Sequence, residues 1–123
     1  MTTSDLDELK ALCAEWQERL RLQDWDIFLE IKRFHEMDEA THLGNAHVVP
    51  KYHSARIALV HPDDYYTDAW RPYDMEFILV HECLHIWTKQ LNLDDTDAIS
   101  THEEMMINAL ARALVKLKRE AHP

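Results

Sequence analysis

Apolar residues recur every three or four positions near the start of the chain. This spacing places side chains on one face of a helix, where they can enter a core. Ser4 can cap the segment, with Asp7 at the third position of a pattern like a capping box. The pattern therefore predicts a helix from about Asp5 to Leu22. Its expected buried face consists of Leu6, Leu9, Leu12, Cys13, Trp16 and Leu20.

The spacing changes from helical to alternating after Trp25. Ile27, Leu29 and Ile31 stand at every second position, which is the pattern of a half-buried strand. Two shorter segments have the same tendency, and residues 51–53 can join them as a hairpin. Residues 41–45, around the single glycine Gly44, are expected to form a turn. The middle of the chain therefore predicts three short strands, at 25–34, 46–50 and 54–60.

Two helices are predicted in the second half of the chain, after a turn at 61–64. The first runs from about Asp74, its expected N-cap, to Leu91, and it is apolar nearly all round, as is typical of a helix in the middle of a domain. The second follows a loop at 92–99 and runs from about 101 to 120. Together these elements predict an α+β domain with a small three-stranded sheet. The expected apolar stripe of the last helix consists of Ile107, Leu110, Leu114 and Leu117.

The size and charge of the chain narrow its possible partners. A length of 123 residues suits one domain spanning 1–123, and 46% of the residues are hydrophobic. The formal net charge of −10 argues against nucleic-acid binding, because phosphate contacts need a basic surface. No apolar stretch is long enough to span a bilayer, and no signal peptide is visible. We therefore expect a cytoplasmic protein without nucleic-acid or membrane partners, in which Cys13 and Cys83 are buried free thiols.

The strongest chemical signal is His81-Glu82-Cys83-Leu84-His85, inside the apolar helix. This is the motif H-E-x-x-H, which places two imidazoles one helical turn apart on the same face. Both rings can bind one metal ion, and ligands of this type favour zinc over iron or manganese. Glu82 projects about 100° away around the helix axis, where it can reach a water molecule at the metal. We therefore predict that Zn²⁺ binds to His81 and His85, with Glu82 as the catalytic general base.

A catalytic zinc site also needs a third protein ligand and an open fourth position. A third histidine in the pattern H-E-x-x-H-x-x-G-x-x-H is excluded, because Thr88 and Leu91 stand where Gly and His are required. The remaining common choice is a carboxylate on the following helix, where Glu103 and Glu104 both occur. The helical wheel places Glu103 in line with Ile107, but both glutamates also close capping-box patterns. These arguments alone leave both glutamates open.

The spacing of the motif resembles that of the gluzincin metallopeptidases, in which eighteen residues separate H-E-x-x-H from a ligand glutamate. This resemblance implies that Glu104 is the third ligand. The segment Glu104-x-x-Ile107-Asn108-x-Leu110-Ala111 is also similar to the E-x-x-A-N-x-F-A helix of ImmA/IrrE-like peptidases, and the chain resembles minimal zincin domains of phage and prophage genes. The resemblance implies a zincin-like minimal fold. Asn108, one turn beyond Glu104, is then expected to hydrogen-bond a ligand imidazole.

These observations predict a zinc-dependent peptidase acting on a peptide or protein substrate. By analogy with zincins, an extended peptide would add to a sheet edge near the metal helix, and the strand at 54–60 is the expected edge. Two alternatives stay open: a non-catalytic, zinc-stabilised binding or regulatory module of phage origin, and a metal-free protein with a chance motif. A group that stabilises the oxyanion is also expected. The candidates by residue type are Tyr65, Tyr66, Tyr73, His61 and His102.

Overall fold

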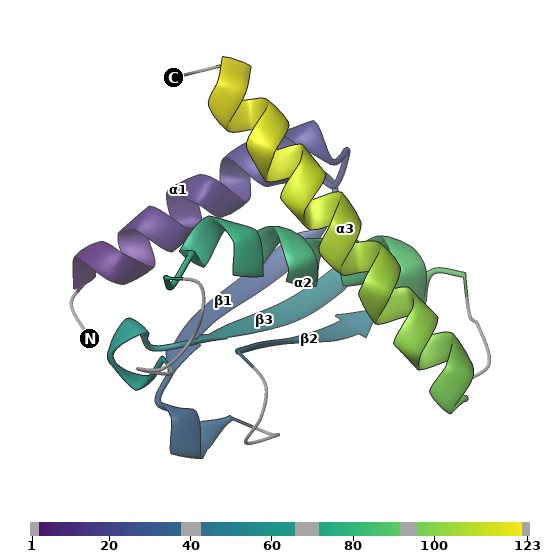
Figure 1. Ribbon diagram of the computed structural model, residues 1–123, viewed down its shortest axis with the longest axis horizontal. Helices are drawn as coiled ribbons and strands as arrows, with labels where there is room; N and C mark the ends of the chain where they lie inside the picture. Colours follow the sequence, from purple (N-terminus) through teal and green to yellow (C-terminus); the bar gives the residue numbers. More distant parts are fainter. Residues whose placement is uncertain (1–2, 38–42, 66–71, 92–95, 122–123) are drawn as a thin grey trace.

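The computed structural model describes residues 3–37, 43–65, 72–91 and 96–121 (Figure 1). The described residues form three α-helices and one three-stranded sheet, which confirms the predicted α+β class. In chain order, the helices and strands are α1 (Thr3–Arg19), β1 (Asp26–Lys32), β2 (Gly44–Val49), β3 (Ser54–Val60), α2 (Met75–Lys89) and α3 (Asp97–Ala121). Single turns of 3₁₀-helix lie at Phe34–Glu36, Pro50–Tyr52 and Pro62–Asp64.

The strand order of the sheet is β1-β3-β2. β1 is parallel to β3, and β2 is antiparallel to it, with Gly44 opposite Leu59. β3 is therefore the central strand, and the expectation that 54–60 forms a free edge is wrong. The edge that lies beside α2 belongs to β2. The tight hairpin between β2 and β3 was predicted at 51–53, and His53 adopts the left-handed conformation there, with φ of 48°.

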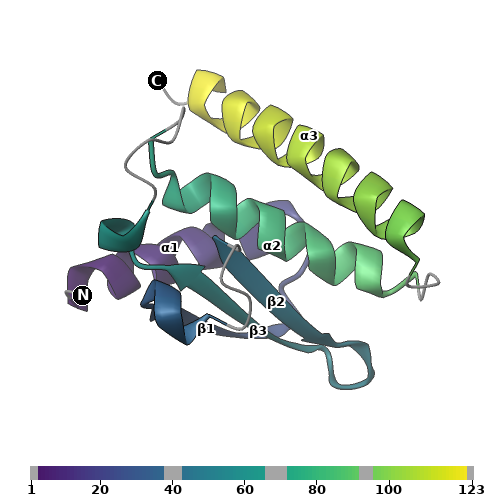
Figure 2. The ribbon, with the colours of Figure 1, turned by 60° about the horizontal axis from the view of Figure 1, so that its bottom comes forward.

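The helices form two layers on one face of the sheet. Figure 2 shows α1 and α2 directly against the sheet, and α3 on the side of α2 that faces away from it. α2 is therefore covered on opposite sides, which explains why its sequence is apolar nearly all round. Asp74 caps α2 as predicted, since its side chain accepts a hydrogen bond of 3.1 Å from the backbone N–H of Phe77.

Two predicted boundaries in the first half of the chain are wrong. α1 begins at Thr3, so Ser4 lies within the helix and is not its N-cap. Gly44 and Asn45 open strand β2, where a turn was expected, because their backbone pairs with β3. Both errors concern the ends of elements, where local signals are weakest. Cys13 and Cys83 are buried free thiols, as predicted.

α3 begins earlier than the sequence suggested. Its first residue is Asp97, and Thr96 Oγ1 accepts a hydrogen bond of 3.2 Å from the backbone N–H of Ile99. Ser100 and Thr101 therefore lie inside the helix, and the two capping boxes proposed for them do not form. Thr96, about one turn upstream, supplies the capping hydrogen bond instead.

The buried stripe of α3 differs from the predicted one. Ile107, Ala111 and Val115 face the core, whereas Leu110 and Leu117 are 45% and 62% exposed. Small side chains at the crossing let two helix backbones approach closely, so the flank with alanine and valine packs against α2. This rotation of the helix decides which of its polar residues reach α2.

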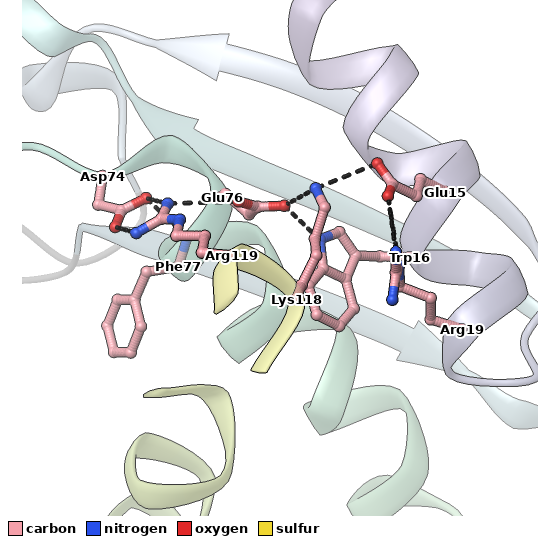
Figure 3. Close-up of polar contacts among 8 residues, drawn as sticks. All are labelled: Glu15, Trp16, Arg19, Asp74, Glu76, Phe77, Lys118 and Arg119. Carbon is pink, nitrogen blue, oxygen red and sulfur yellow. Dashed lines mark hydrogen bonds and ion pairs between the residues drawn. The ribbon is translucent and has the colours of Figure 1, made fainter. Parts of the chain in front are cut away.

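A buried ionic network joins the three helices at one end of the molecule (Figure 3). Glu76 of α2 is buried, and its carboxylate accepts hydrogen bonds from Trp16 Nε1 of α1, at 2.8 Å, and from Lys118 Nζ of α3. Arg119 forms two hydrogen bonds of 2.9 and 3.0 Å with the carboxylate of Asp74. The network therefore fixes the C-terminal half of α3 over the start of α2. No helix in the described part of the chain has both the length and the apolar character needed to cross a membrane.

Candidate metal centre

His81 and His85 lie one turn apart on the side of α2 that faces α3. Their ring centroids are 5.2 Å apart. Glu104 of α3 meets both rings, with its carboxylate oxygens 3.1 Å from His81 Nε2 and 2.8 Å from His85 Nε2. One ligand atom from each of the three residues lies within 4.8 Å of the other two. The structure thus brings together the three residues that the motif and the spacing selected.

The chemistry of these three groups fits a divalent zinc ion. Two imidazole nitrogens and one carboxylate oxygen are a common ligand set of catalytic zinc, which leaves a fourth position open. A tetrahedral ion with bonds of about 2.1 Å holds its ligand atoms about 3.4 Å apart. The two carboxylate oxygens of Glu104 each approach one ring, Oε2 at 3.1 Å from His81 Nε2 and Oε1 at 2.8 Å from His85 Nε2. Binding of an ion would therefore require the carboxylate to turn so that one of its oxygens faces the ion.

Asn108 orients the first ring. Its Oδ1 lies 2.9 Å from His81 Nδ1. A proton on Nδ1 would satisfy this contact and would leave Nε2 as the atom available to a metal ion. This is the hydrogen bond expected for Asn108 from its position one turn beyond Glu104, and such contacts fix the tautomer and direction of a ligand histidine.

Glu103 lies beside the second ring. His85 Nδ1 is buried without a hydrogen-bond partner among the described residues, and Glu103 Oε1 is 3.7 Å from it. The Glu103 side chain is 13% exposed, so the helical-wheel argument for its inward direction was correct. Nevertheless it faces Nδ1, whereas Glu104, although 50% exposed, faces both Nε2 atoms. The geometry therefore favours Glu104 over Glu103 as the carboxylate that would meet an ion held by the two Nε2 atoms.

Burial keeps the second ring neutral. It lowers the pKa of His85, against the opposing charge of Glu104. A neutral imidazole is the form that binds a metal, because the protonated ring has no free lone pair. The protein environment therefore prepares His85 for ligation.

Glu82 occupies the space between α2 and the edge strand β2. It is only 5% exposed, and this burial, together with the charge of Glu104, raises its pKa to about 8. An ideal Cβ built on Gly44 would lie 2.9 Å from Glu82 Oε2. The backbone of β2 therefore approaches the carboxylate as closely as a residue without a side chain allows.

Gly44 was missed as a functional position. The sequence suggested only a turn there, yet this is the single glycine among 123 residues. In a chain so poor in glycine, the one that occurs marks a place where a side chain does not fit. The signal was present in the sequence, but the partner, Glu82, could not be named without the fold.

A cavity of about 680 Å³ opens beside the centre, between the start of α2 and the second half of α3. Its lining includes Phe77 and Asn108, each of which also contacts His81: the ring centroids of Phe77 and His81 are 6.5 Å apart. The guanidinium carbon of Arg112 lies 5.6 Å from the centroid of the Phe77 ring. The cavity therefore begins one helical turn from the candidate ligands.

Two of the oxyanion candidates have structural partners. The hydroxyl of Tyr73 donates a hydrogen bond of 2.9 Å to the backbone oxygen of Val60, and burial raises the pKa of Tyr73 to about 12. His61 is buried, and its Nδ1 accepts a hydrogen bond of 3.0 Å from the backbone N–H of Asp63. Both side chains thus help to fix the segment that follows β3.

The other three oxyanion candidates differ in their positions. Tyr65 lines the cavity and makes an edge contact with Tyr73, with ring centroids 5.6 Å apart. His102 is exposed on α3, and Tyr66 lies outside the described residues. Among the candidates that the structure describes, Tyr65 is therefore the one that lines the cavity beside the centre.

Comparisons with known proteins gave no match. No protein-family model, no curated protein and no solved structure matches the chain. The geometry of the centre therefore carries the functional argument by itself.

Proposed function

We propose that the chain is a zinc-dependent hydrolase that cleaves a peptide or protein substrate. The observation that supports this most is the convergence of His81 Nε2, His85 Nε2 and the carboxylate of Glu104, with Glu82 on the same helix. These three residues would hold the ion. When bound, zinc would supply Lewis-acid chemistry, lowering the pKa of a water molecule and polarising a carbonyl group.

Glu82 is the proposed proton acceptor. Its carboxylate is shielded from solvent, and its pKa is raised to about 8 in the protein without metal. Without metal this pKa favours the protonated acid near neutral pH, and the charge of a bound zinc ion would favour the carboxylate that accepts a proton. The role of Glu82 thus rests on its environment as well as on its place in the motif.

A peptide substrate is supported by the position of β2. This strand is an edge of the sheet, and it runs beside α2 with Gly44 against Glu82. An extended peptide can pair with such an edge through backbone hydrogen bonds, which would place its carbonyl groups near the centre. β2 therefore replaces β3 as the proposed site of strand addition.

A zinc-stabilised module without catalysis is the second candidate function. The burial of Glu82 favours it, since a carboxylate wedged between α2 and β2 can also be a packing element. In that case zinc would hold α2 and α3 together and the surface would bind a partner. The two functions predict the same ligands and differ only in what Glu82 does.

Metal analysis combined with one isosteric substitution tests the proposal. The purified protein is stripped with a chelator and reloaded with zinc, and its metal content and its hydrolysis of a quenched peptide library are measured. We expect one zinc per chain, lost in H81A and H85A, and turnover that is lost in E82Q while its zinc content stays unchanged. Zinc binding without any hydrolysis would favour the module, and a reloaded protein that binds no metal would refute both functions.

A further inference from the structure

We propose that the cavity beside the candidate metal centre binds a carboxylate on an apolar body, with the guanidinium of Arg112 as its anchor. This inference rests on the proposed function, because it assigns the cavity to the part of the substrate next to the cleaved bond. The expected substrates are therefore peptides that carry a negative charge next to the cleaved bond.

The walls of the cavity are suited to an apolar group. Leu43 at the start of the β2 segment, Phe77 and Ile78 of α2, and Val115 of α3 all line it. A volume of about 680 Å³ lies within the range of small-molecule and side-chain sites, which is roughly 300–1,000 Å³. Apolar walls give affinity, and a few polar groups then determine which ligand is accepted.

Arg112 differs from the other cations around the cavity in having no carboxylate partner. Arg119 is held by Asp74, and Lys116 lies 3.9 Å from Glu120. Among the described residues, no carboxylate lies within ion-pair distance of Arg112, whose guanidinium sits over the ring of Phe77. A guanidinium stacked on an aromatic ring keeps its N–H groups free for a second partner, and their planar fork matches a carboxylate.

The overall charge of the chain strengthens this selectivity. With a formal net charge of −10, most of the surface repels an anionic ligand. Arg112 is an exposed cation without a carboxylate partner at the border of this largely apolar cavity, so it is the lining group with which an anion can pair. The carboxylate could belong to an Asp or Glu side chain or to the C-terminus of the substrate, and both would present the same two oxygens to Arg112.

The position of the cavity connects it to the chemistry. Phe77 precedes His81 by one helical turn, and Asn108, which bonds His81 Nδ1, also lines the cavity. Arg112 follows Asn108 by one further turn of α3. A ligand held by Arg112 would therefore extend along the groove between α2 and α3 toward the two imidazoles.

Direct binding measurements separate this inference from the proposed function. Four short labelled peptides, identical except for Glu or Gln at one position and a free or amidated C-terminus, are titrated into the protein with and without zinc, and fluorescence anisotropy is recorded. We expect the carboxylate-bearing peptides to bind roughly ten- to a hundredfold more tightly than the fully neutral peptide, as for other hydrogen bonds to charged groups. The two singly charged peptides show which source of carboxylate is preferred.

Substitutions assign the effect to one side chain. R112L should abolish the preference for carboxylates and leave binding of the neutral peptide unchanged, whereas the control K116M, on the same cavity, should retain the preference. Circular dichroism checks that both variants are folded. Equal binding of all four peptides, equal weakening of all four in R112L, or no binding at all would each overturn the inference. Selective binding without hydrolysis would leave it standing while refuting the proposed enzyme.

Discussion

The α-carbon of Gly44 lies directly against the carboxylate of Glu82. A Cβ at position 44 would be 2.9 Å from Glu82 Oε2 and 2.9 Å from Ile78 Cγ2, closer than such atoms are found in real proteins. The edge strand β2 and the motif helix α2 therefore meet at the proposed general base. The position of that carboxylate and the course of β2 depend on each other.

The variant G44A tests this dependence. The added methyl group must move either β2 or the Glu82 side chain, and overpacking of this kind costs about 1–3 kcal/mol of folding free energy. We expect the variant to keep its zinc but to lose most of its peptide hydrolysis, measured as kcat/KM. K51A, at an exposed position in the turn that follows the strand, is the control and should behave like the wild type. Full activity in G44A would show that the contact does not position Glu82.

The metal-free protein should lose stability as Glu82 ionises. Its pKa is raised by burial from 4.5 to about 8, so the folded state favours the neutral acid. The stabilising effect of this preference is complete below about pH 4.5 and is lost as the pH rises toward 8. E82Q mimics the neutral form at every pH. We therefore expect the melting temperature of E82Q, in chelator, to exceed that of the wild type by several degrees at pH 8.

The same comparison at pH 5 is the control. There the difference in melting temperature should be much smaller, because pH 5 lies only just above the ordinary pKa of 4.5 and little of the stabilising effect has yet been lost. A difference in melting temperature that does not change between pH 5 and pH 8 would argue against a buried, ionisable Glu82.

The local pattern was sufficient to predict the elements, but not how they pair. The alternation of Ile27, Leu29 and Ile31 marked β1. Nothing in this pattern indicates that β1 pairs with β3 and not with β2, the next strand along the chain. Strand order depends on contacts far apart in the sequence. For the same reason hydrophobicity alone predicted only part of the buried stripe of α3. Ile107 is buried and Leu114 packs against the core, but Leu110 and Leu117 are exposed, and Ala111 allows the closer approach to α2.

The candidate site was more predictable than the fold because a helix fixes the geometry of its own motif. His81 and His85 share a face at any helix position, whatever surrounds them. Glu104 reaches the two histidines only because α3 crosses α2. The sequence could identify it only through its spacing of eighteen residues from the motif. Arg112 and Gly44 carried no local signal of their neighbours Phe77 and Glu82, because those contacts arise only when α2, α3 and β2 assemble.

The two neighbouring glutamates of α3 should have unequal effects on metal binding. Glu104 faces both Nε2 atoms, whereas Glu103 lies 3.7 Å from His85 Nδ1. We expect E104A to abolish zinc binding in a competition assay with a chromogenic chelator. E103A should weaken it only about 10- to 100-fold, the usual effect of removing a group that orients a ligand. If E103A loses the metal and E104A keeps it, the assignment of the ligand is wrong.

Asn108 should influence zinc affinity through the ring of His81. Its Oδ1 lies 2.9 Å from Nδ1 and would accept a hydrogen bond from a proton there, so N108A would free the ring to rotate and to change tautomer. We expect a loss of zinc affinity of about 10- to 100-fold. N108D retains an acceptor at the same place and should restore most of the affinity. An unchanged dissociation constant in N108A would mean that the hydrogen bond is incidental.

The buried carboxylate of Glu76 should matter more for stability than any surface ion pair of the chain. Glu76 receives hydrogen bonds from Trp16 and Lys118, and although burial opposes its ionisation, these bonds hold its pKa below the usual value. Removing Glu76 leaves the buried N–H of Trp16 without its acceptor and leaves Lys118 paired with Glu15 alone, which we expect to cost about 1–3 kcal/mol.

The variant E76A should therefore unfold at a much lower urea concentration than the wild type at pH 7. Glu15 also pairs with Lys118, at 3.1 Å, but it is 40% exposed, so the control E15A should cost about 0–1 kcal/mol. Because the pKa of Glu76 is lowered, its contribution is present at neutral pH and is lost on acidification through that pKa. The difference in unfolding free energy between E76A and E15A should consequently become smaller in acid. Equal effects of E76A and E15A at pH 7 would show that α3 is held over α2 by apolar contacts alone.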